Sequence, residues 1–181
     1  MANVCVFCSA SDKIPDIYKN TAINLGELIG KRKHNIVYGG GNLSMMGIVA
    51  SSAQANGARA IGILPRRWKD LAEIEDELIA ADDLRHRKTL YELKSDAFIA
   101  LPGGFGTLDE IFDTIVCRQI EIHKKPFAIV NTNNFFEYLK QHIDKSYAEG
   151  FINPEHRADY RFVSTPLEAI TYVEKHLTAA K

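Results

Sequence analysis

The 181 residues of the chain are enough for one sizeable domain, and 46% apolar with 25% charged residues is the composition of a globular core with a solvated surface. Lys and Arg number 22 against 23 Asp and Glu, so the charge favours neither a nucleic acid nor a membrane as a partner. We therefore expect a single domain over residues 1–181 that binds anions only locally.

Short apolar runs alternate with longer segments of helical period, which predicts an α/β fold with a mostly parallel sheet covered by helices on both faces. Strands are expected at Val4–Phe7, Asn35–Tyr38, Ala58–Leu64, Ala97–Leu101, Phe127–Asn131 and Tyr160–Val163. Helices are expected at Ile17–Arg32, Met45–Asn56, Leu84–Lys94, Glu110–Ile122, Phe135–Tyr147 and Pro166–Leu177. Pro65–Glu77 is expected to be a surface loop, and Asn133 and Asn134 to cap the helix that follows them.

The three cysteines, Cys5, Cys8 and Cys117, are too few and too unevenly placed for a disulfide framework, and the N-terminus lacks the pattern of a signal peptide. We therefore expect a cytoplasmic protein, and no apolar run approaches the length of a membrane span. Cys5 and Cys8 lie in a strand-like run, so they are expected to be inert and buried. The six histidines show no ligand spacing, and no metal site is expected.

Two glycine-rich turns follow predicted strands, Gly39-Gly-Gly41 and Gly103-Gly-Phe-Gly106, and residues 8–11 belong to the same edge of the sheet. Ligands of open parallel sheets bind where strand carboxyl ends meet helix N-termini. In Pro102–Glu110 the glycines let the backbone approach an anion, the next helix adds partial positive charge, and Thr107 supplies a hydroxyl. This segment therefore predicts a phosphate cradle.

Two sets of residues near this cradle have alternative interpretations. Thr107 and Glu110 have the spacing of a capping box, but a carboxylate beside a bound nucleotide would also stabilise an oxocarbenium ion on the sugar. Arg85-His-Arg-Lys88 is either a solvated basic turn or a clamp, with Arg87 holding phosphate or ribose hydroxyls and Lys88 adding a point charge.

Taken together in this order, several motifs resemble the LONELY GUY family of cytokinin riboside 5′-monophosphate phosphoribohydrolases, whose members are often mislabelled as lysine decarboxylases. The resemblance extends from about Val4 to Ile152 and rests on Phe7-Cys8, Tyr38-Gly-Gly-Gly41 with Met46-Gly47, Arg87-Lys88, Pro102-Gly-Gly-x-Gly-Thr107-x-x-Glu110 and Gln119 with His123-x-Lys-Pro126.

The resemblance implies a Rossmann-like, doubly wound fold and a homodimer with active sites near its interface. It also implies hydrolysis, without a cofactor, of adenine or N6-substituted adenine nucleoside 5′-monophosphates to the free base and ribose 5-phosphate. Catalytic roles fall on Arg87 and Glu110. Substrate or phosphate binding falls on Lys88, Gly103, Gly104, Phe105, Gly106, Thr107, Leu108 and Asp109.

Some positions depart from the family pattern, which leaves the choice of base open. The family usually has Gly where Ser9 and Ser44 stand, Met-His where Leu84-Arg85 stand, and Thr-Trp where Val116-Cys117 stand. An acidic substrate contact of the family falls on either Glu73 or Glu75.

Two rival functions remain. One is a non-catalytic nucleotide-binding or carrier protein of the same fold. The other is pyridoxal-phosphate-dependent lysine decarboxylation, which needs a buried lysine.

Overall fold

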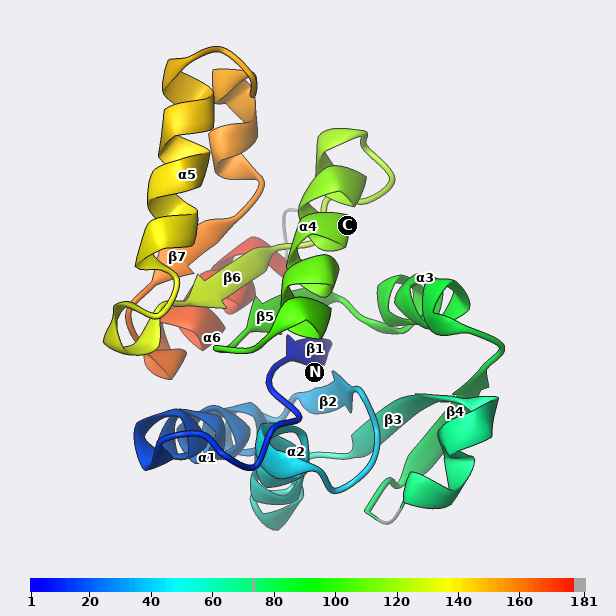
Figure 1. The fold of residues 1–181 in the computed structure, drawn as a ribbon. Helices are drawn as coiled ribbons and strands as arrows, with labels where there is room; N and C mark the ends of the chain where they lie inside the picture. The colour runs from blue at the N-terminus through cyan, green and yellow to red at the C-terminus, as the bar shows by residue number, and fades with distance from the viewer. Residues whose placement is uncertain (73, 178–181) are drawn as a thin grey trace.

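In the computed structural model, which describes residues 1–72 and 74–177, the chain forms one seven-stranded sheet (Figure 1). All neighbouring strands run parallel, in the order β4-β3-β2-β1-β5-β6-β7. The strands are β1 Asn3–Phe7, β2 Asn35–Tyr38, β3 Ala60–Pro65, β4 Glu77–Ala81, β5 Ala97–Ala100, β6 Phe127–Val130 and β7 Arg161–Val163. The helices are α1 Asp16–Lys31, α2 Ser44–Ala55, α3 Leu84–Lys94, α4 Phe105–Gln119, α5 Glu137–Ala148 and α6 Pro166–Leu177, with single 3₁₀ turns η1 Arg66–Leu71, η2 Thr132–Asn134 and η3 Pro154–Ala158.

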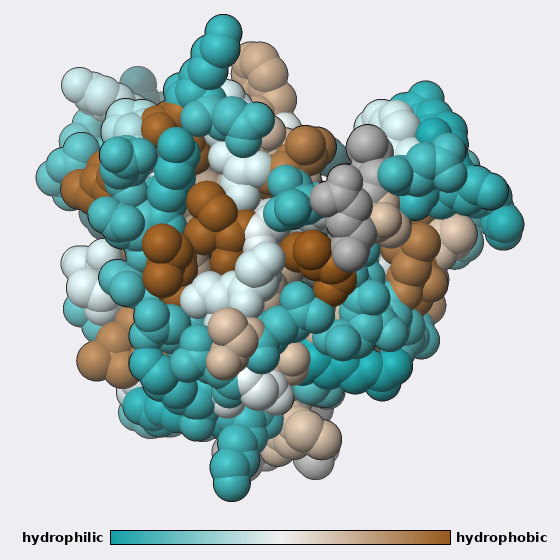
Figure 2. All heavy atoms as spheres, turned by 90° about the horizontal axis from the view of Figure 1, so that it is seen from below, coloured by the Kyte–Doolittle hydropathy of each residue, from teal (hydrophilic) through white to brown (hydrophobic). Residues whose placement is uncertain are grey.

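The two faces of the sheet bury two separate apolar clusters. Successive side chains of a strand point to opposite faces, so Val4 and Val6 of β1 belong to one cluster and Cys5 and Phe7 to the other. The first cluster is covered by α1, α2 and α6, and the second by α3, α4 and α5. Figure 2, which views the molecule from below Figure 1, shows a mainly hydrophilic surface with apolar side chains near its middle. The α/β fold is therefore as predicted.

The order of the strands determines where a ligand can bind. From the central β1 the chain proceeds outward through β2, β3 and β4, then crosses over to β5, β6 and β7 on the other side. The strand order thus reverses between β1 and β5. In open parallel sheets the crevice outside the carboxyl ends of the strands at such a reversal is the usual ligand site.

Three local predictions are wrong. Pro65–Glu77 is not simply a loop, because it contains η1 and leads into the unpredicted edge strand β4, whose exposure alternates and whose sequence begins next to acidic residues. Helix α4 begins at Phe105 rather than Glu110. Asn133 and Asn134 do not cap α5: both have positive φ, and the Asn131 Oδ1 atom accepts the hydrogen bond from the Phe136 backbone N–H.

The cysteine prediction is confirmed for its buried pair. Cys5 and Cys8 are buried, and all three cysteines are unbridged. Within the described residues, no helix is long and apolar enough to cross a bilayer.

Candidate functional site

A pocket of about 480 Å³ lies at the carboxyl ends of the strands, near the reversal of strand order. Its walls come from residues 8–11 after β1, the turn after β2, Leu64 of β3, and the first turns of α3 and α4. Five of the predicted site residues line it: Arg87, Gly104, Gly106, Thr107 and Glu110. Segments that are far apart in the sequence therefore converge on one cavity, as the glycine-rich turns predicted.

Arg87 is held in this pocket by the ends of two strands. Its Nε atom donates to the carbonyl of Ile63 at 2.8 Å, and its Nη2 atom donates to the carbonyl of Gly39 at 2.6 Å. Its guanidinium carbon lies 5.2 Å from the centre of the Tyr91 ring. A Cβ atom at Gly39 would lie 2.5 Å from Nη2, so glycine is required for this close approach. The Arg87 fork is fixed before any substrate arrives, which a solvated basic turn would not achieve.

Glu75 stabilises the glycine turn against which Arg87 rests. Its Oε1 atom accepts hydrogen bonds from the Tyr38 hydroxyl, at 2.8 Å, and from the backbone N–H of Gly41. Burial opposes ionisation of this carboxyl, but the hydrogen bonds from Gly41 and Tyr38 outweigh it and lower the pKa. Glu75 does not line the pocket, so it acts by holding the turn, whereas residue 73 lies outside the described residues.

The start of α4 contradicts the capping-box interpretation of Thr107 and Glu110. The N-cap residue is Gly104, with no side-chain hydrogen bond, so Thr107 and Glu110 both lie inside the helix and one turn apart on the same face. A Cβ atom at Gly103 would lie 2.1 Å from the Thr107 Oγ1 atom, whereas one at Gly104 would meet nothing within 4 Å. Gly103 therefore accommodates the Thr107 side chain, and Gly104 leaves space open on the pocket side.

Glu110 is the carboxyl group of the pocket lining, and its pKa lies well above the ordinary value for a glutamate. Burial raises the pKa of its carboxyl to about 7, the Arg87 guanidinium opposes that shift, and the charge of Asp109 adds to it. Both protonation states are thus populated near neutral pH. A carboxyl with a pKa near the working pH is typical of general acid–base groups.

The other predicted site residues do not line this pocket. Lys88 forms ion pairs with Asp109 at 3.1 Å and Asp113 at 3.0 Å on α4. Burial opposes the charge of Lys88, but these two carboxylates outweigh it and raise the pKa of the lysine. Leu108 packs against the core below α4, and Phe105 is 93% exposed.

The departures at Val116 and Cys117 also lie away from the main pocket. Val116 is exposed on the outer side of α4. Cys117 lines a narrow crevice between α3 and α4, and Glu110 is also part of the lining of this crevice. Sequence reasoning assigned no site role to four of the apolar side chains that line the pocket, which are Leu43, Met46, Leu64 and Trp68. They are dispersed in the sequence, and only Met46 belongs to a recognised motif.

Ser44, another departure from the family pattern, has a structural explanation. It is the first residue of α2 and has a φ of +45°, in the left-handed region that favours glycine. Its Oγ atom donates a hydrogen bond to the carbonyl of Ser11 at 2.5 Å. This bond offsets part of the strain and ties α2 to the segment after β1. Ser9 lines the pocket, and its Oγ atom accepts a hydrogen bond from the Ser11 N–H at 3.0 Å.

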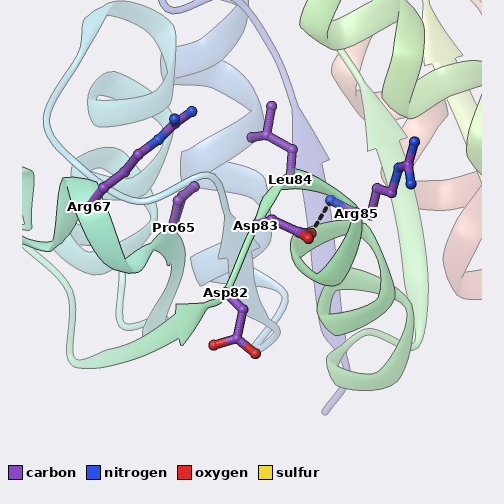
Figure 3. A pocket seen from close by; sticks show the side chains of 6 residues that line it. All are labelled: Pro65, Arg67, Asp82, Asp83, Leu84 and Arg85. Carbon is purple, nitrogen blue, oxygen red and sulfur yellow. Dashed lines mark hydrogen bonds between the residues drawn. The ribbon is translucent and has the colours of Figure 1, made fainter.

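A side-chain cap positions the first turn of α3. The Asp83 Oδ1 atom accepts hydrogen bonds from the backbone N–H groups of Arg85 and His86, each at 2.8 Å. Figure 3 shows this cap in a second, open pocket of about 360 Å³, with Arg67 and Arg85 on opposite sides. Arg85 therefore belongs to this second pocket, and the cap sets the direction in which Arg87 leaves the helix.

The residues of the main pocket offer neither a lysine nor a metal cluster. No lysine is among the described residues that line it. Likewise, residues 1–72 and 74–177 contain no group of three or more His, Cys, Asp or Glu side chains gathered to hold a metal ion.

Sequence comparisons identify close relatives of the chain. The family model described as possible lysine decarboxylase matches residues 46–173. A cytokinin riboside 5′-monophosphate phosphoribohydrolase of Arabidopsis thaliana is 40% identical over 166 residues, which are 90% of this chain and 72% of the relative. A probable cytokinin riboside 5′-monophosphate phosphoribohydrolase of Oryza sativa subsp. japonica is 38% identical over 176 residues, which are 96% of this chain and 72% of the relative.

Solved structures share the fold at lower identity. The molybdenum cofactor binding protein of Rippkaea orientalis is similar with a TM-score of 0.75 at 21% identity, over 96% of this chain and 95% of that one. The molybdenum cofactor carrier protein of Chlamydomonas reinhardtii gives a TM-score of 0.73 at 19% identity, over 98% of both chains. At these identities the likeness shows the Rossmann-like fold alone.

The raised pKa of Glu110 predicts a stability change with pH. The folded state retains its proton up to a pKa of about 7, whereas the unfolded carboxyl loses it near 4.5. Stability is therefore lost as the pH rises through that window. In the Glu110→Gln variant this loss is absent, so its free energy of unfolding relative to the wild type should increase by about 2 kcal/mol between pH 5 and pH 8. Urea denaturation at both pH values measures it, and a pH-independent difference would contradict the raised pKa.

Proposed function

Since the chain belongs to the LONELY GUY family, whose model is described as possible lysine decarboxylase, we propose that it hydrolyses the N-glycosidic bond of purine nucleoside 5′-monophosphates. The products are the free base, adenine or an N6-substituted adenine of the cytokinin type, and ribose 5-phosphate. The observation that supports this function best is the convergence of a fixed Arg87 and a desolvated Glu110 on one pocket beside the N-terminus of α4.

We assign the 5′-phosphate to the first turn of α4. The first backbone hydrogen bond of this helix joins the Leu108 N–H to the Gly104 carbonyl, so the N–H groups of the residues between them have no partner inside the helix. These N–H groups and the helix dipole attract an anion. Gly104 and Gly106 leave the approach open. Lys88 adds positive charge from outside the pocket and makes no direct contact with the phosphate, because Asp109 and Asp113 already pair with its ammonium group.

The base is assigned to the apolar side of the pocket. Leu43, Met46, Leu64 and Trp68 line this side and give a planar ring an apolar surface. Arg87 lies between this surface and the α4 turn, in a position to hold the ribose hydroxyls through its remaining N–H groups.

Glu110 supplies the chemistry at the sugar. Its carboxylate orients a water molecule, accepts a proton from it as the water oxygen bonds to C1′, and stabilises the positive charge on the ribose ring. The C1′–N9 bond breaks, and the base leaves with the bonding electron pair and takes up a proton. A pKa of about 7 allows Glu110 to accept a proton and then release it near neutral pH.

The rival functions have less support. A Schiff base with pyridoxal phosphate requires a lysine at the reacting centre, and no lysine is among the described residues of the pocket lining. A carrier that binds nucleotides without turnover would not need a carboxyl with a raised pKa beside a fixed arginine. The two functions differ in one observable, which is the release of base.

We also propose that the protein works in the cytoplasm. All three cysteines are unbridged, which is usual for a reducing compartment.

The first test measures release of adenine and ribose 5-phosphate from AMP, and of the N6-substituted base from N6-isopentenyl-AMP, by chromatography. Glu110→Gln should reduce release by about 100-fold or more, because removing one group that stabilises the transition state typically costs that much. Glu27→Gln, on the exposed side of α1, is the matched control and should release base at the wild-type rate. Saturable AMP binding without base release by the wild type would favour the carrier.

We further propose that the chain forms a homodimer through the outer side of α4. Phe112, Val116 and Ile120, at helical spacing, are 43%, 47% and 60% exposed, and Phe105 at the start of the helix is 93% exposed. Such a row of exposed apolar side chains is typical of an interface. Pairing of two copies would place two active sites close to one interface.

The double variant Phe112→Glu/Val116→Glu tests the dimer. We expect it to elute with the monomer mass of 20.3 kDa in light scattering coupled to size exclusion, while the wild type elutes at twice that mass. The control is Leu93→Glu on α3, which changes an apolar residue that is still more exposed, at 68%, and should leave the dimer intact. A wild-type monomer, or a dimer that survives the double variant, would exclude this interface.

A further inference from the structure

A third pocket, of about 430 Å³, lies at the opposite edge of the sheet from the site of Arg87 and Glu110. It is lined by the end of α4, the loop before β6, the segment that enters β7, and the last turns of α6. Since all strands are parallel, the beginnings of β6 and β7 lie at the edge away from the carboxyl ends. The pocket is therefore separate from the proposed active site.

The lining of this pocket is strongly basic. It includes Arg118, Lys124, Arg157 and Arg161, and no Asp or Glu is among its described lining residues. Arg157 pairs with Asp144 at 3.2 Å, and the Arg118 Nε atom lies 3.6 Å from Asp159. Within the described part of the chain, the side chains of Lys124 and Arg161 have no ion-pair partner. Two positive charges are thus uncompensated in a chain whose net charge is −1.

Arg118 is the fixed part of this basic group. Its side chain is only 13% exposed, and its Nη1 atom donates hydrogen bonds to the carbonyls of Lys124 and Lys125. These bonds fix the loop before β6, and with it the backbone of Lys124. The Nε atom of Arg118 is buried and has no hydrogen-bond partner among the described residues. Arg118 thus has an ion-pair partner at its Nε atom but makes no hydrogen bond there, and its charge adds to those of Lys124 and Arg161 in attracting an anion.

Aromatic rings form the wall next to these cations. The Tyr172 and His176 rings lie with their centres 4.3 Å apart at the end of α6, and Tyr160 lines the pocket from the segment before β7. Burial raises the pKa of the Tyr172 hydroxyl, the charges of Arg118 and Arg161 oppose that rise, and the Asp159 carboxylate adds to it. Flat rings beside arginines are a favourable surface for a planar base.

We propose that this pocket is a second nucleotide site, which binds a nucleoside monophosphate with its phosphate on Arg118, Lys124 and Arg161 and its base on the Tyr172–His176 wall. A volume of about 430 Å³ is within the usual range for small-ligand pockets. The proposal does not depend on the activity of the first site, because the two pockets share no lining residue.

The test is calorimetric titration of the full chain with carbocyclic AMP at low salt. In this analogue a methylene group replaces the ribose ring oxygen, so no oxocarbenium ion forms and the probe is not consumed. We expect two equivalents per chain for the wild type. In Lys124→Glu/Arg161→Glu one of the two affinities should fall by at least 10-fold while the other is unchanged. Lys31→Glu/Lys33→Glu makes the same charge change on exposed residues, one at the end of α1 and one just after it, and should retain both sites.

Further variants and ligands separate the effect of charge from that of folding, and the phosphate from the base. Lys124→Gln/Arg161→Gln, which adds no negative charge, should weaken the same site, and thermal melting checks that both variants fold. Ribose 5-phosphate and adenosine should each bind this site at least 10-fold more weakly than carbocyclic AMP, because each lacks one half of the ligand. A site that both double variants leave unaltered, or that binds ribose 5-phosphate equally well, would overturn the proposal. If the proposed active site does not bind nucleotides, a single site is seen, and it is still lost with Lys124 and Arg161.

Discussion

The attachment of Arg87 to the ends of β2 and β3 is the constraint on which the functional site depends. One guanidinium donates to the carbonyls of Gly39, just after β2, and of Ile63, within β3, so it links two neighbouring strands near their carboxyl ends. Glu75 holds the turn after β2 in the shape that this contact needs, and the Asp83 cap directs the helix from which Arg87 projects. The cation is thereby held in place at little further entropic cost when a substrate binds.

Glu110 gains its properties from the same arrangement. The start of α4 at Phe105 places this carboxyl one turn beyond Thr107 and inside the helix, where burial raises its pKa and Arg87 limits the rise. Without the arginine the carboxyl would remain protonated to still higher pH. Without burial it would be ionised at all pH values near neutrality. The balance between desolvation and one fixed charge thus sets the pH range in which Glu110 can exchange a proton.

The sequence contained enough information for the sheet, the helices and the convergence of the two glycine turns, because these follow from periodicity and from strand polarity. The start of α4 could not be predicted, because the glycines of Gly103–Gly106 indicate a turn. The backbone N–H groups of the first helical turn make no hydrogen bond inside the helix, so Gly106 is tolerated there. The edge strand β4 was missed because its alternation lies in exposure and not in residue type: Leu78 and Ala80 are apolar and yet exposed, and only Ala81 is buried. The ion pairs of Lys88 depend on how α3 packs beside α4, which no local pattern encodes.

In the mechanism that we propose, cleavage of the glycosidic bond depends on the desolvated carboxyl of Glu110. The most direct test is the pH dependence of kcat for release of adenine at saturating AMP, where the ionisation of free substrate no longer contributes. We predict an acid limb with an apparent pKa near 7, the value to which burial raises Glu110. A limb near 4.5, the ordinary value for a glutamate, or a rate constant that does not change between about pH 5 and pH 8, would contradict the account.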